Sequence, residues 1–230
     1  MFEKLKKKNL GPIQVSDYIN IGIARNILFL TGAILLFIAC SLLYGFILSE
    51  IRAVPVSEAM YKKGYTELKN PNIIINRHNY TLSLYEDSVL IKDYRANFGK
   101  SVSAPKSRAG DNSTPVGEYQ ICGIDTAHKY HKFFQINYPN LKDAANALRK
   151  GWISQKEYNE IKFQYYYEGC IENNRVLGGN LGIQGIGKFN FIIKNLPFVF
   201  NWTNGSIALS DEDIDEIFSI VKIGTKVVIK

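Results

Sequence analysis

The stretch NWTNGSIALSDEDIDEIFSIVKIGTKVVIK, residues 201–230, contains a turn, a helix and a strand in close succession. Gly205 suits a tight turn, because glycine adopts backbone conformations that other residues avoid. Ser210 begins a segment whose first turn is acidic, which suits the positive end of a helix dipole, and GTKVVIK has the composition of a closing strand. Ser206 lies between the glycine turn and an apolar step, where several acyl-transfer enzymes place a nucleophile. Whether Ser206 still acts as one is the question that this stretch raises.

Upstream, short runs rich in β-branched and aromatic residues predict consecutive antiparallel strands. Three of them, NIIIN, YTLSLY and SVLIKDYRANF, lie between residues 72 and 98. Further strands are expected in EYQICGI, in FFQINYPN and near LGIQGIG, with a loop at residues 103–117. The order is not a regular βαβ alternation, so a parallel doubly wound sheet is not expected.

Two helices are expected to interrupt the strands. NLKDAANALRKG offers Asn140 as an N-cap and Gly151 as a stop. SQKEYNEIKFQYYYEG begins with Ser154 and Glu157 in the spacing of a capping box. With the acidic segment after Ser210, this predicts a mainly β domain that carries inserted helices.

An uncharged run, ILFLTGAILLFIACSLLYGFIL, occupies residues 27–48. It is long enough for a helix to cross a hydrocarbon core about 30 Å thick. A buried core helix of this length normally has a polar face, and this run has none. A signal peptide has a shorter apolar region that ends at a small-residue cleavage site, which SLLYGFILSE matches poorly. We therefore predict an uncleaved, single-pass transmembrane helix.

The charges around this run predict its orientation. Four lysines precede it in FEKLKKKN, with Arg25 at its edge, whereas Arg52 follows it beside an acidic residue. The positive-inside rule then places the N-terminus in the cytoplasm and the domain outside it, in a periplasm or at the cell surface. The expected organisation is a basic cytoplasmic tail (1–26), a transmembrane helix (27–48), a stalk (49–71) and an extracytoplasmic domain (72–230).

Composition and cysteine spacing exclude several kinds of partner. The net charge of +7 permits contact with anionic polymers, but no zinc-finger spacing or RNA-binding signature occurs, so nucleic acid is not expected. Cys40, Cys122 and Cys170 form no metal-ligand pattern, so no metal and no cofactor are expected. Cys122 and Cys170 lie in the part expected outside the cytoplasm, where disulfides form, but the sequence leaves open whether they pair.

Four stretches together resemble the L,D-transpeptidase catalytic domain (the YkuD type), in particular its murein-transpeptidase branch with an Asp-Trp-Thr-x-Gly-Cys-Ile-Ala signature. KSRAGDNSTPVGEYQI looks like the branch's Lys-x-x-x-Gly-Asp-x-x-Thr-Pro-x-Gly-x-Tyr segment, and FFQINYPNLKDA is similar to its strand ending in Tyr-Pro-Asn. LGGNLGIQGIG resembles Leu-Gly-Gly-x-Ile-x-Ile-His-Gly, and NWTNGSIALSDED matches the signature. The resemblance covers about residues 72–230 and implies a β-sandwich-like domain.

The resemblance also implies a chemistry. Such enzymes transfer an acyl group from one peptidoglycan stem peptide to an amine, through a thioester on cysteine. A histidine deprotonates the thiol, and backbone N–H groups stabilise the oxyanion. A thiolate suits this reaction because it is strongly nucleophilic near neutral pH, whereas a free hydroxyl is not.

This sequence departs from the family pattern at both catalytic positions. Ser206 stands where the family has cysteine, and Gln184, 22 residues upstream, stands where it has histidine. The signature's aspartate is replaced by Asn201. A serine hydroxyl reacts poorly unless a base takes its proton, and an amide side chain cannot serve as that base. We therefore expect Ser206 to mark a lost nucleophile.

For Ser206 to react, another group would have to replace the histidine. His128 and His131 lie in GIDTAHKYHKFFQ, which the resemblance places near the substrate groove, and Lys188 follows Gln184 by four residues. Histidines in loops are more often solvated polar residues, and a lysine just past a glycine turn is more often exposed. None of the three is the base that we expect.

The scaffold around the two positions is retained. Gly205 beside Ser206 suits a turn whose backbone donors face a bound carbonyl. By resemblance, contacts with a stem peptide are expected from Arg108, Asp111, Tyr138, Trp202 and Thr203. Simpler roles remain open for three of them, namely an ion pair within the loop for Arg108 and Asp111 and core packing for Trp202.

We therefore expect a membrane-anchored protein of cell-wall assembly that is catalytically degenerate. Its groove would bind peptidoglycan stem peptides or a cell-wall enzyme, and its anchor would contact the lipid bilayer. The alternative is an active peptidoglycan L,D-transpeptidase that uses Ser206 with a relocated base, which a histidine or lysine within hydrogen-bond reach of the hydroxyl would favour. A third possibility is a purely structural membrane protein whose groove binds nothing.

Overall fold

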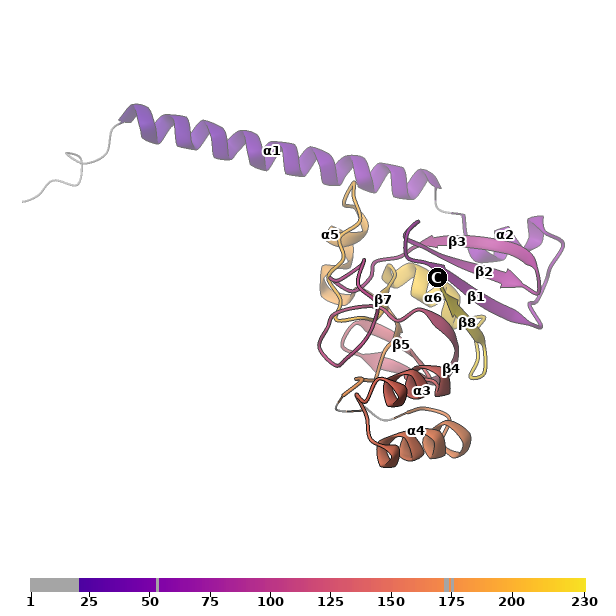
Figure 1. Cartoon of the computed structure of the whole chain (residues 1–230). Helices are drawn as coiled ribbons and strands as arrows, with labels where there is room; N and C mark the ends of the chain where they lie inside the picture. Colours follow the sequence, from indigo (N-terminus) through magenta and orange to yellow (C-terminus); the bar gives the residue numbers. More distant parts are fainter. Residues whose placement is uncertain (1–20, 53, 172–173, 175) are drawn as a thin grey trace, which may run out of the picture.

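A long N-terminal helix is followed by a mixed α/β domain (Figure 1). The computed structural model describes residues 21–52, 54–171, 174 and 176–230. The lysine-rich part of the expected cytoplasmic tail, within residues 1–20, lies outside the described residues. The orientation inferred from those lysines therefore stays a prediction.

Helix α1 (Ile21–Arg52) contains the predicted apolar run. Over Ile21–Leu48 it is long and apolar enough to cross a membrane, and none of its most apolar stretch is buried inside the protein. The expected apolar N-terminal helix is confirmed, and its apolar part begins earlier than predicted. After α1, the segment expected to form a stalk contains the short helix α2 (Val56–Lys62).

Within the described residues, eight strands form one mixed sheet in the order β3-β2-β1-β8-β4-β5-β6-β7. The first half is the predicted antiparallel meander of β1 (Pro71–Asn76), β2 (Thr81–Glu86) and β3 (Val89–Arg95). In β2 the predicted alternation holds, because Leu82 and Leu84 face the core and are fully buried. The mainly β expectation is therefore confirmed for this half.

The last strand joins the two halves of the sheet. β8 (Lys226–Ile229) pairs in parallel with β1 and antiparallel with β4 (Gly117–His128). Beyond β4, the sheet continues through β5 (His131–Ile136), β6 (Gly182–Gln184) and β7 (Ile207–Ala208). The chain thus places its C-terminal strand in the centre, where it fixes the relative position of the two halves.

The helices begin where the sequence predicts. Asn140 caps α3 (Leu141–Arg149) and Ser154 caps α4 (Gln155–Tyr167), each in a reciprocal capping box. Ser210 caps α6 (Asp211–Phe218), which packs two buried isoleucines against the sheet. A short 3₁₀ turn η2 (Gly187–Phe189) and helix α5 (Asn190–Lys194), neither of which was predicted, follow β6.

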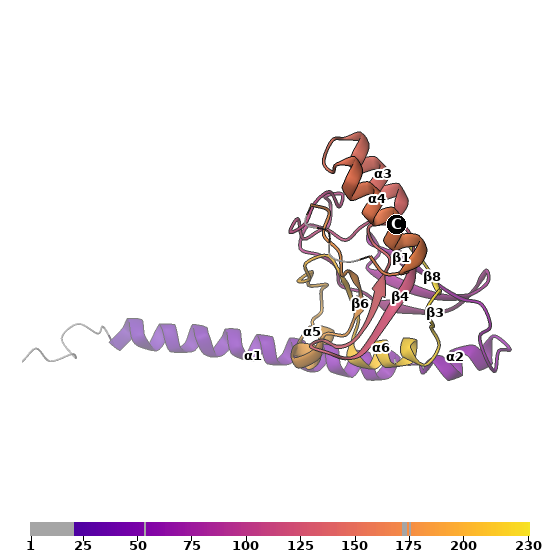
Figure 2. The same ribbon diagram turned by 90° about the horizontal axis from the view of Figure 1, so that it is seen from below.

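Helices α3 and α4 form a lobe with a small core of its own, separate from the main core around the sheet (Figures 1 and 2). A disulfide between Cys122 of β4 and Cys170, just after α4, ties this lobe to the sheet. The pairing that the sequence left open is thus present, whereas Cys40 is free and exposed on α1.

Candidate functional site

Gln184 and Ser206 lie on neighbouring segments of the sheet, with Ser206 level with Gly182, two residues before Gln184. Strands β6 and β7 pair in parallel, with Gln184 opposite Ala208. Ser206 immediately precedes β7, and its Oγ accepts a hydrogen bond from the Gly182 backbone N–H at 3.4 Å. Gln184 is 5% exposed and Ser206 is 9% exposed. The two positions that the resemblance singles out are therefore neighbours in a nearly closed part of the fold.

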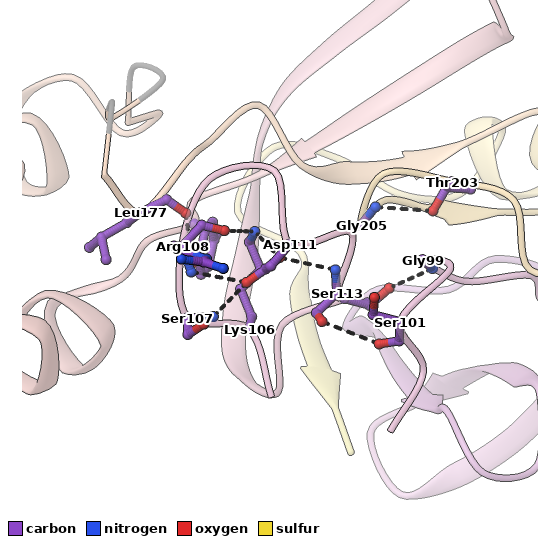
Figure 3. A network of polar contacts seen from close by, with 12 residues as sticks. Gly99, Ser101, Lys106, Ser107, Arg108, Asp111, Ser113, Leu177, Thr203 and Gly205 are labelled. Carbon is purple, nitrogen blue, oxygen red and sulfur yellow. Dashed lines mark hydrogen bonds and ion pairs between the residues drawn. The ribbon is translucent and has the colours of Figure 1, made fainter. Parts of the chain in front are cut away.

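The turn before Ser206 is fixed by Thr203 and Gly205. Thr203 Oγ1 donates to the Ser206 carbonyl oxygen. Thr203 Oγ1 also accepts the Gly205 N–H at 3.2 Å (Figure 3). Gly205 has a φ of 126°, and a Cβ there would lie 2.8 Å from the Ser113 carbonyl oxygen. Glycine is required here by both conformation and space. The Gly205 N–H, expected to face a bound carbonyl, is instead engaged within the turn.

The backbone after Gln184 is held by Asp211 at the start of α6. Its Oδ1 accepts hydrogen bonds from the N–H groups of Ile186 and Gly187, at 2.8 and 2.9 Å. A Cβ on Gly185 would lie 2.6 Å from this oxygen and equally close to the Tyr130 carbonyl oxygen. Such close packing holds the backbone on the C-terminal side of Gln184.

A cavity of about 300 Å³ lies beside Gln184 and Ser206. Its walls come from the β4–β5 hairpin, from the segment before β6 and from the turn before β7. Trp202 meets the Tyr130 ring edge-on, with the ring centroids 5.1 Å apart. Among the described residues that line the cavity there is no carboxylate, and Lys129 supplies a positive charge. The cavity therefore suits a ligand with an apolar part and an anionic group.

The candidate replacement bases lie in different surroundings. His128 lines the cavity and stacks on Phe133, with centroids 4.9 Å apart. His131 instead contacts Asp215 of α6 through Nε2 at 2.7 Å. Lys188 is exposed and is not among the described residues that line the cavity. Of the three, His128 alone shares the cavity with Ser206.

The electrostatics of His128 do not favour a role as base. Burial lowers its pKa, and nearby Lys129 lowers it further against the opposing charge of Asp125. A lowered pKa makes the ring a weaker base, and its Nδ1 accepts the Tyr130 N–H at 3.4 Å. With Nδ1 as an acceptor, the proton lies on Nε2. Neither nitrogen is then free to take a proton from Ser206.

The loop that precedes β4 is organised by Asp111. Its carboxylate accepts the N–H groups of Ser107, Arg108 and Ser113 and pairs with Lys106 at 2.6 Å (Figure 3). The ion pair of Asp111 is with Lys106 and not with Arg108, which is exposed and bonds the carboxylate through its backbone N–H. Burial alone would raise the pKa of Asp111, but these hydrogen bonds outweigh it and lower the pKa from 3.8 to about 2.

Replacing Asp111 by asparagine is expected to lower the free energy of unfolding at pH 7 by about 1–2 kcal/mol, because charge-assisted hydrogen bonds to the loop are lost. Since the folded pKa is depressed, this contribution is present above the ordinary pKa and is lost as the pH falls toward 2. Urea unfolding of Asp111→Asn at pH 7 and at pH 2.5 checks both statements. The difference from the wild type should shrink at the lower pH. Glu118→Gln, on an exposed side chain, is the control and should change little at either pH.

Two further expected substrate contacts have different environments. Tyr138 is 3% exposed, and its hydroxyl donates to the Leu177 carbonyl oxygen at 3.2 Å. It lies in the main core, which is at odds with a direct substrate contact. Trp202 is half-buried and lines the cavity, and within the described residues its indole N–H has no hydrogen-bond partner. Trp202 is therefore in a position to contact a ligand.

Some features of the site could not be read from the sequence. Asn201, at the position of the family's aspartate, accepts the Phe98 N–H at 2.8 Å and so joins the turn to the segment after β3. Lys129 and Asn180 line the cavity from GIDTAHKYHKFFQ and LGGNLGIQGIG, two segments in which neither residue was predicted as part of the site. The positive φ of 51° at Asn180 is typical of asparagine in turns, but nothing in the local sequence places that turn beside Ser206.

The model of the L,D-transpeptidase catalytic domain family (YkuD) matches residues 70–229 of the chain. Solved structures with a similar fold include an L,D-transpeptidase from Xylanimonas cellulosilytica, at 13% identity and a TM-score of 0.41 over 77% of this chain and 70% of that one. The helical cell shape determining protein Pgp2 from Campylobacter jejuni has 17% identity and a TM-score of 0.46, over 70% of this chain and 47% of that one. The structure of Bdellovibrio bacteriovorus Bd1075 has 18% identity and a TM-score of 0.43, over 71% of this chain and 48% of that one.

The chain spans about half the length of the Pgp2 and Bd1075 structures. No curated protein matches it. The family assignment of the chain depends on the sequence match over residues 70–229.

Proposed function

Because the chain belongs to the L,D-transpeptidase catalytic domain (YkuD) family, we propose that it takes part in peptidoglycan assembly as a membrane-anchored, extracytoplasmic protein that binds its ligand without chemical turnover. One observation carries this proposal. The cavity of the site is present. Beside it, however, Ser206 and Gln184 stand at the two positions where the family's chemistry requires a cysteine and a histidine.

Helix α1 supports the anchoring. Among the described residues, none of the most apolar stretch of the helix over Ile21–Leu48 is buried, so packing within the protein does not account for its composition. A bilayer is the environment in which such a helix is stable, because its side chains avoid water and its backbone groups bond within the helix. The Cys122–Cys170 disulfide agrees with an extracytoplasmic location, since disulfides persist in oxidising compartments.

The absence of a base supports binding without catalysis. Gln184 is an amide, the Nδ1 of His128 already accepts a backbone N–H, and Ser206 Oγ is nearly buried and also accepts one. A hydroxyl that cannot lose its proton does not attack an amide carbonyl at a useful rate. The site therefore retains a pocket without its reacting groups.

The cavity also agrees with stem peptides as ligands. Such peptides end in carboxylates and carry amide and short apolar side chains. Lys129 offers a cation to the carboxylate, while Trp202 and Tyr130 offer flat apolar surface. An aromatic side chain that becomes buried between protein and ligand is typical of the few residues that contribute most of the binding energy.

Substitution of Trp202 by alanine is expected to weaken binding to isolated peptidoglycan sacculi about 10- to 30-fold, as for an aromatic hot spot. Lys129→Ala should weaken it less, because a rim charge contributes little at physiological salt. Both effects are measured by co-sedimentation of the full chain in detergent with sacculi at increasing concentrations.

Trp152→Ala and Lys150→Ala are the matched controls. They form a similar lysine–aromatic pair on the α3–α4 lobe, with Lys150 Nζ 4.4 Å from the Trp152 ring centroid. These two variants should bind sacculi like the wild type. If the control variants lose as much binding to sacculi as the Trp202 and Lys129 variants, the result would contradict a ligand site beside Ser206. No binding by the wild type would also contradict it and would favour a purely structural role.

A second candidate function is acyl transfer by Ser206 with His128 as a relocated base. It has one observation in its favour, namely that both side chains line the same cavity. It requires the His128 ring to release the Tyr130 N–H and move its own proton. We favour the binding function for this reason.

A further inference from the structure

The segment between Gln184 and Trp202 exposes several large apolar side chains. Residues 189–200 read FNFIIKNLPFVF, and we call this segment the apolar loop. Its members that are between 48% and 64% exposed are Phe189, Phe191, Ile192, Phe198 and Phe200. Scattered exposed apolar residues are ordinary, but five in twelve residues form a patch of the kind that marks an interaction surface.

Hydrogen bonds hold the apolar loop to the domain on its polar side. Asn190 and Lys194 both bond the carboxylate of Glu212 on α6. Arg95, at the end of β3, donates through its guanidinium to the carbonyl oxygens of Leu196 and Phe198. The polar groups thus hold the loop to the domain, and the aromatic side chains are left on its outer side.

The apolar loop lies against helix α1. The rings of Phe191 and Phe46 are 6.2 Å apart, and a Cβ on Gly45 would lie 2.0 Å from the Asn195 carbonyl oxygen. Both views show α5 beside the C-terminal part of α1 (Figures 1 and 2). Glycine at position 45 permits this approach, because any side chain would collide with the loop backbone.

These contacts fix the level of the apolar loop along α1. The apolar stretch of α1 ends at Leu48, and Gly45 precedes that end by about 4.5 Å at the helical rise per residue. The loop therefore meets α1 within the last turn of the stretch that is suited to the hydrocarbon core. At that depth lies the boundary between acyl chains and headgroups.

We propose that the apolar loop inserts its exposed aromatic side chains into the outer leaflet of the bilayer that α1 spans. This inference depends on the anchoring of α1 proposed above. Phenylalanine and isoleucine on one side, with Lys188 at the edge, are the composition of segments that lie in the membrane interface. A lipid surface is favoured over a protein partner because the patch is continuous with the apolar helix.

The consequence for the site follows from the ends of the loop. The apolar loop begins shortly after Gln184 and ends just before Trp202, so both ends continue into the cavity walls. Insertion of the loop would hold the cavity at a fixed height close to the membrane. The ligand would then be peptide material next to the membrane surface.

Site-directed spin labelling of the full chain tests this proposal. In a Cys40→Ala background, Phe191→Cys and Phe198→Cys each leave one free thiol, because the other two cysteines are paired. The labelled chains are reconstituted into vesicles of phosphatidylethanolamine and phosphatidylglycerol, and power saturation compares collisions with oxygen and with a water-soluble nickel chelate. Two references are the native Cys40 label and Tyr167→Cys, on an exposed side chain of α4 far from α1.

The labels at 191 and 198 are expected to collide several-fold more with oxygen than with the nickel chelate, as Cys40 does, while the label at 167 shows the reverse. Labels at 191 and 198 that behave like the one at 167, with Cys40 in the bilayer, would overturn the proposal and leave the anchor intact. Labels shielded from both reagents would also overturn it and would indicate a protein partner or a second copy. A Cys40 label accessible to the nickel chelate would refute the anchoring itself.

Discussion

Replacing Gln184 by histidine and Ser206 by cysteine together is expected to turn the chain into an active L,D-transpeptidase. Gln184 ends β6, Ser206 immediately precedes the paired strand β7, and both residues line one cavity. A histidine at 184 could take the proton of a thiol at 206, and general base catalysis of this kind contributes about 10²–10⁴-fold in rate. The thiol also adds intrinsic nucleophilicity that the hydroxyl lacks.

The measurement is product formation from a disaccharide-tetrapeptide donor and an amine acceptor, followed by mass spectrometry. Each single variant is a control, because groups that act as a unit are strongly non-additive. Gln184→His alone and Ser206→Cys alone should therefore show at most a small part of the activity of the double variant. An inactive double variant that still binds sacculi would show that the loss of catalysis extends beyond these two positions.

The Gly205 N–H, which is engaged within the turn, is one group through which catalysis could be lost beyond positions 184 and 206. This donor now bonds Thr203 Oγ1 within the turn. An oxyanion needs backbone donors aimed at it, so the double variant requires at least this donor to reorient when an acyl group is bound. Thr203→Val, which removes the competing acceptor, is therefore informative in the background of the double variant.

Removal of the disulfide is expected to lower the free energy of unfolding by about 2–4 kcal/mol, the usual effect of closing a loop of this size. Cys122 and Cys170 are 48 residues apart, and the segment between them includes the α3–α4 lobe. That lobe has a small core, built from side chains such as Ala144, Ile153 and Ile161. A core of this size holds the lobe weakly once the covalent tie is lost.

Urea unfolding of the Cys122→Ser, Cys170→Ser double variant of the full chain in detergent checks this expectation. Cys40→Ser is the matched control and should unfold like the wild type, since Cys40 is free and exposed on α1. The wild type under reducing conditions should resemble the double variant. Unfolding midpoints that are the same with and without the disulfide would contradict a stabilising role for it.

Local sequence signals predicted much of the fold. The N-caps at Asn140 and Ser154 and the alternation around Leu82 and Leu84 have causes within a few residues of the chain. Helix caps satisfy free backbone N–H groups, and alternating side chains face one side of a strand. Such features are set by the chain itself and are therefore visible before the fold is known.

Features that depend on distant segments were not predictable in this way. The aromatic side chains of the apolar loop are exposed, and the loop's position is set by α1 and by Arg95 of β3. An apolar run such as FIIKNLPFVF carries no signal for that arrangement. The partner of Asp111 is Lys106 for the same reason, because the loop fold and not sequence proximity selects the cation.

The candidate site was predictable in identity but only partly in geometry. Motif order located Ser206 and Gln184, and the parallel pairing of β6 with β7 puts them together. Tyr138 was expected at the substrate, but its ring is buried and its hydroxyl bonds Leu177. A motif records which residues recur at a spacing, and it does not state which of them face a cavity.

Intact-mass spectrometry of the wild-type full chain, incubated with the disaccharide-tetrapeptide donor, tests the central claim most directly. Ser206→Ala is the matched control. A degenerate site predicts no acyl mass on either protein and no transfer product above the level of the control. An acyl adduct that maps to Ser206 in the wild type and is missing from Ser206→Ala would contradict the account and establish a serine acyl transferase.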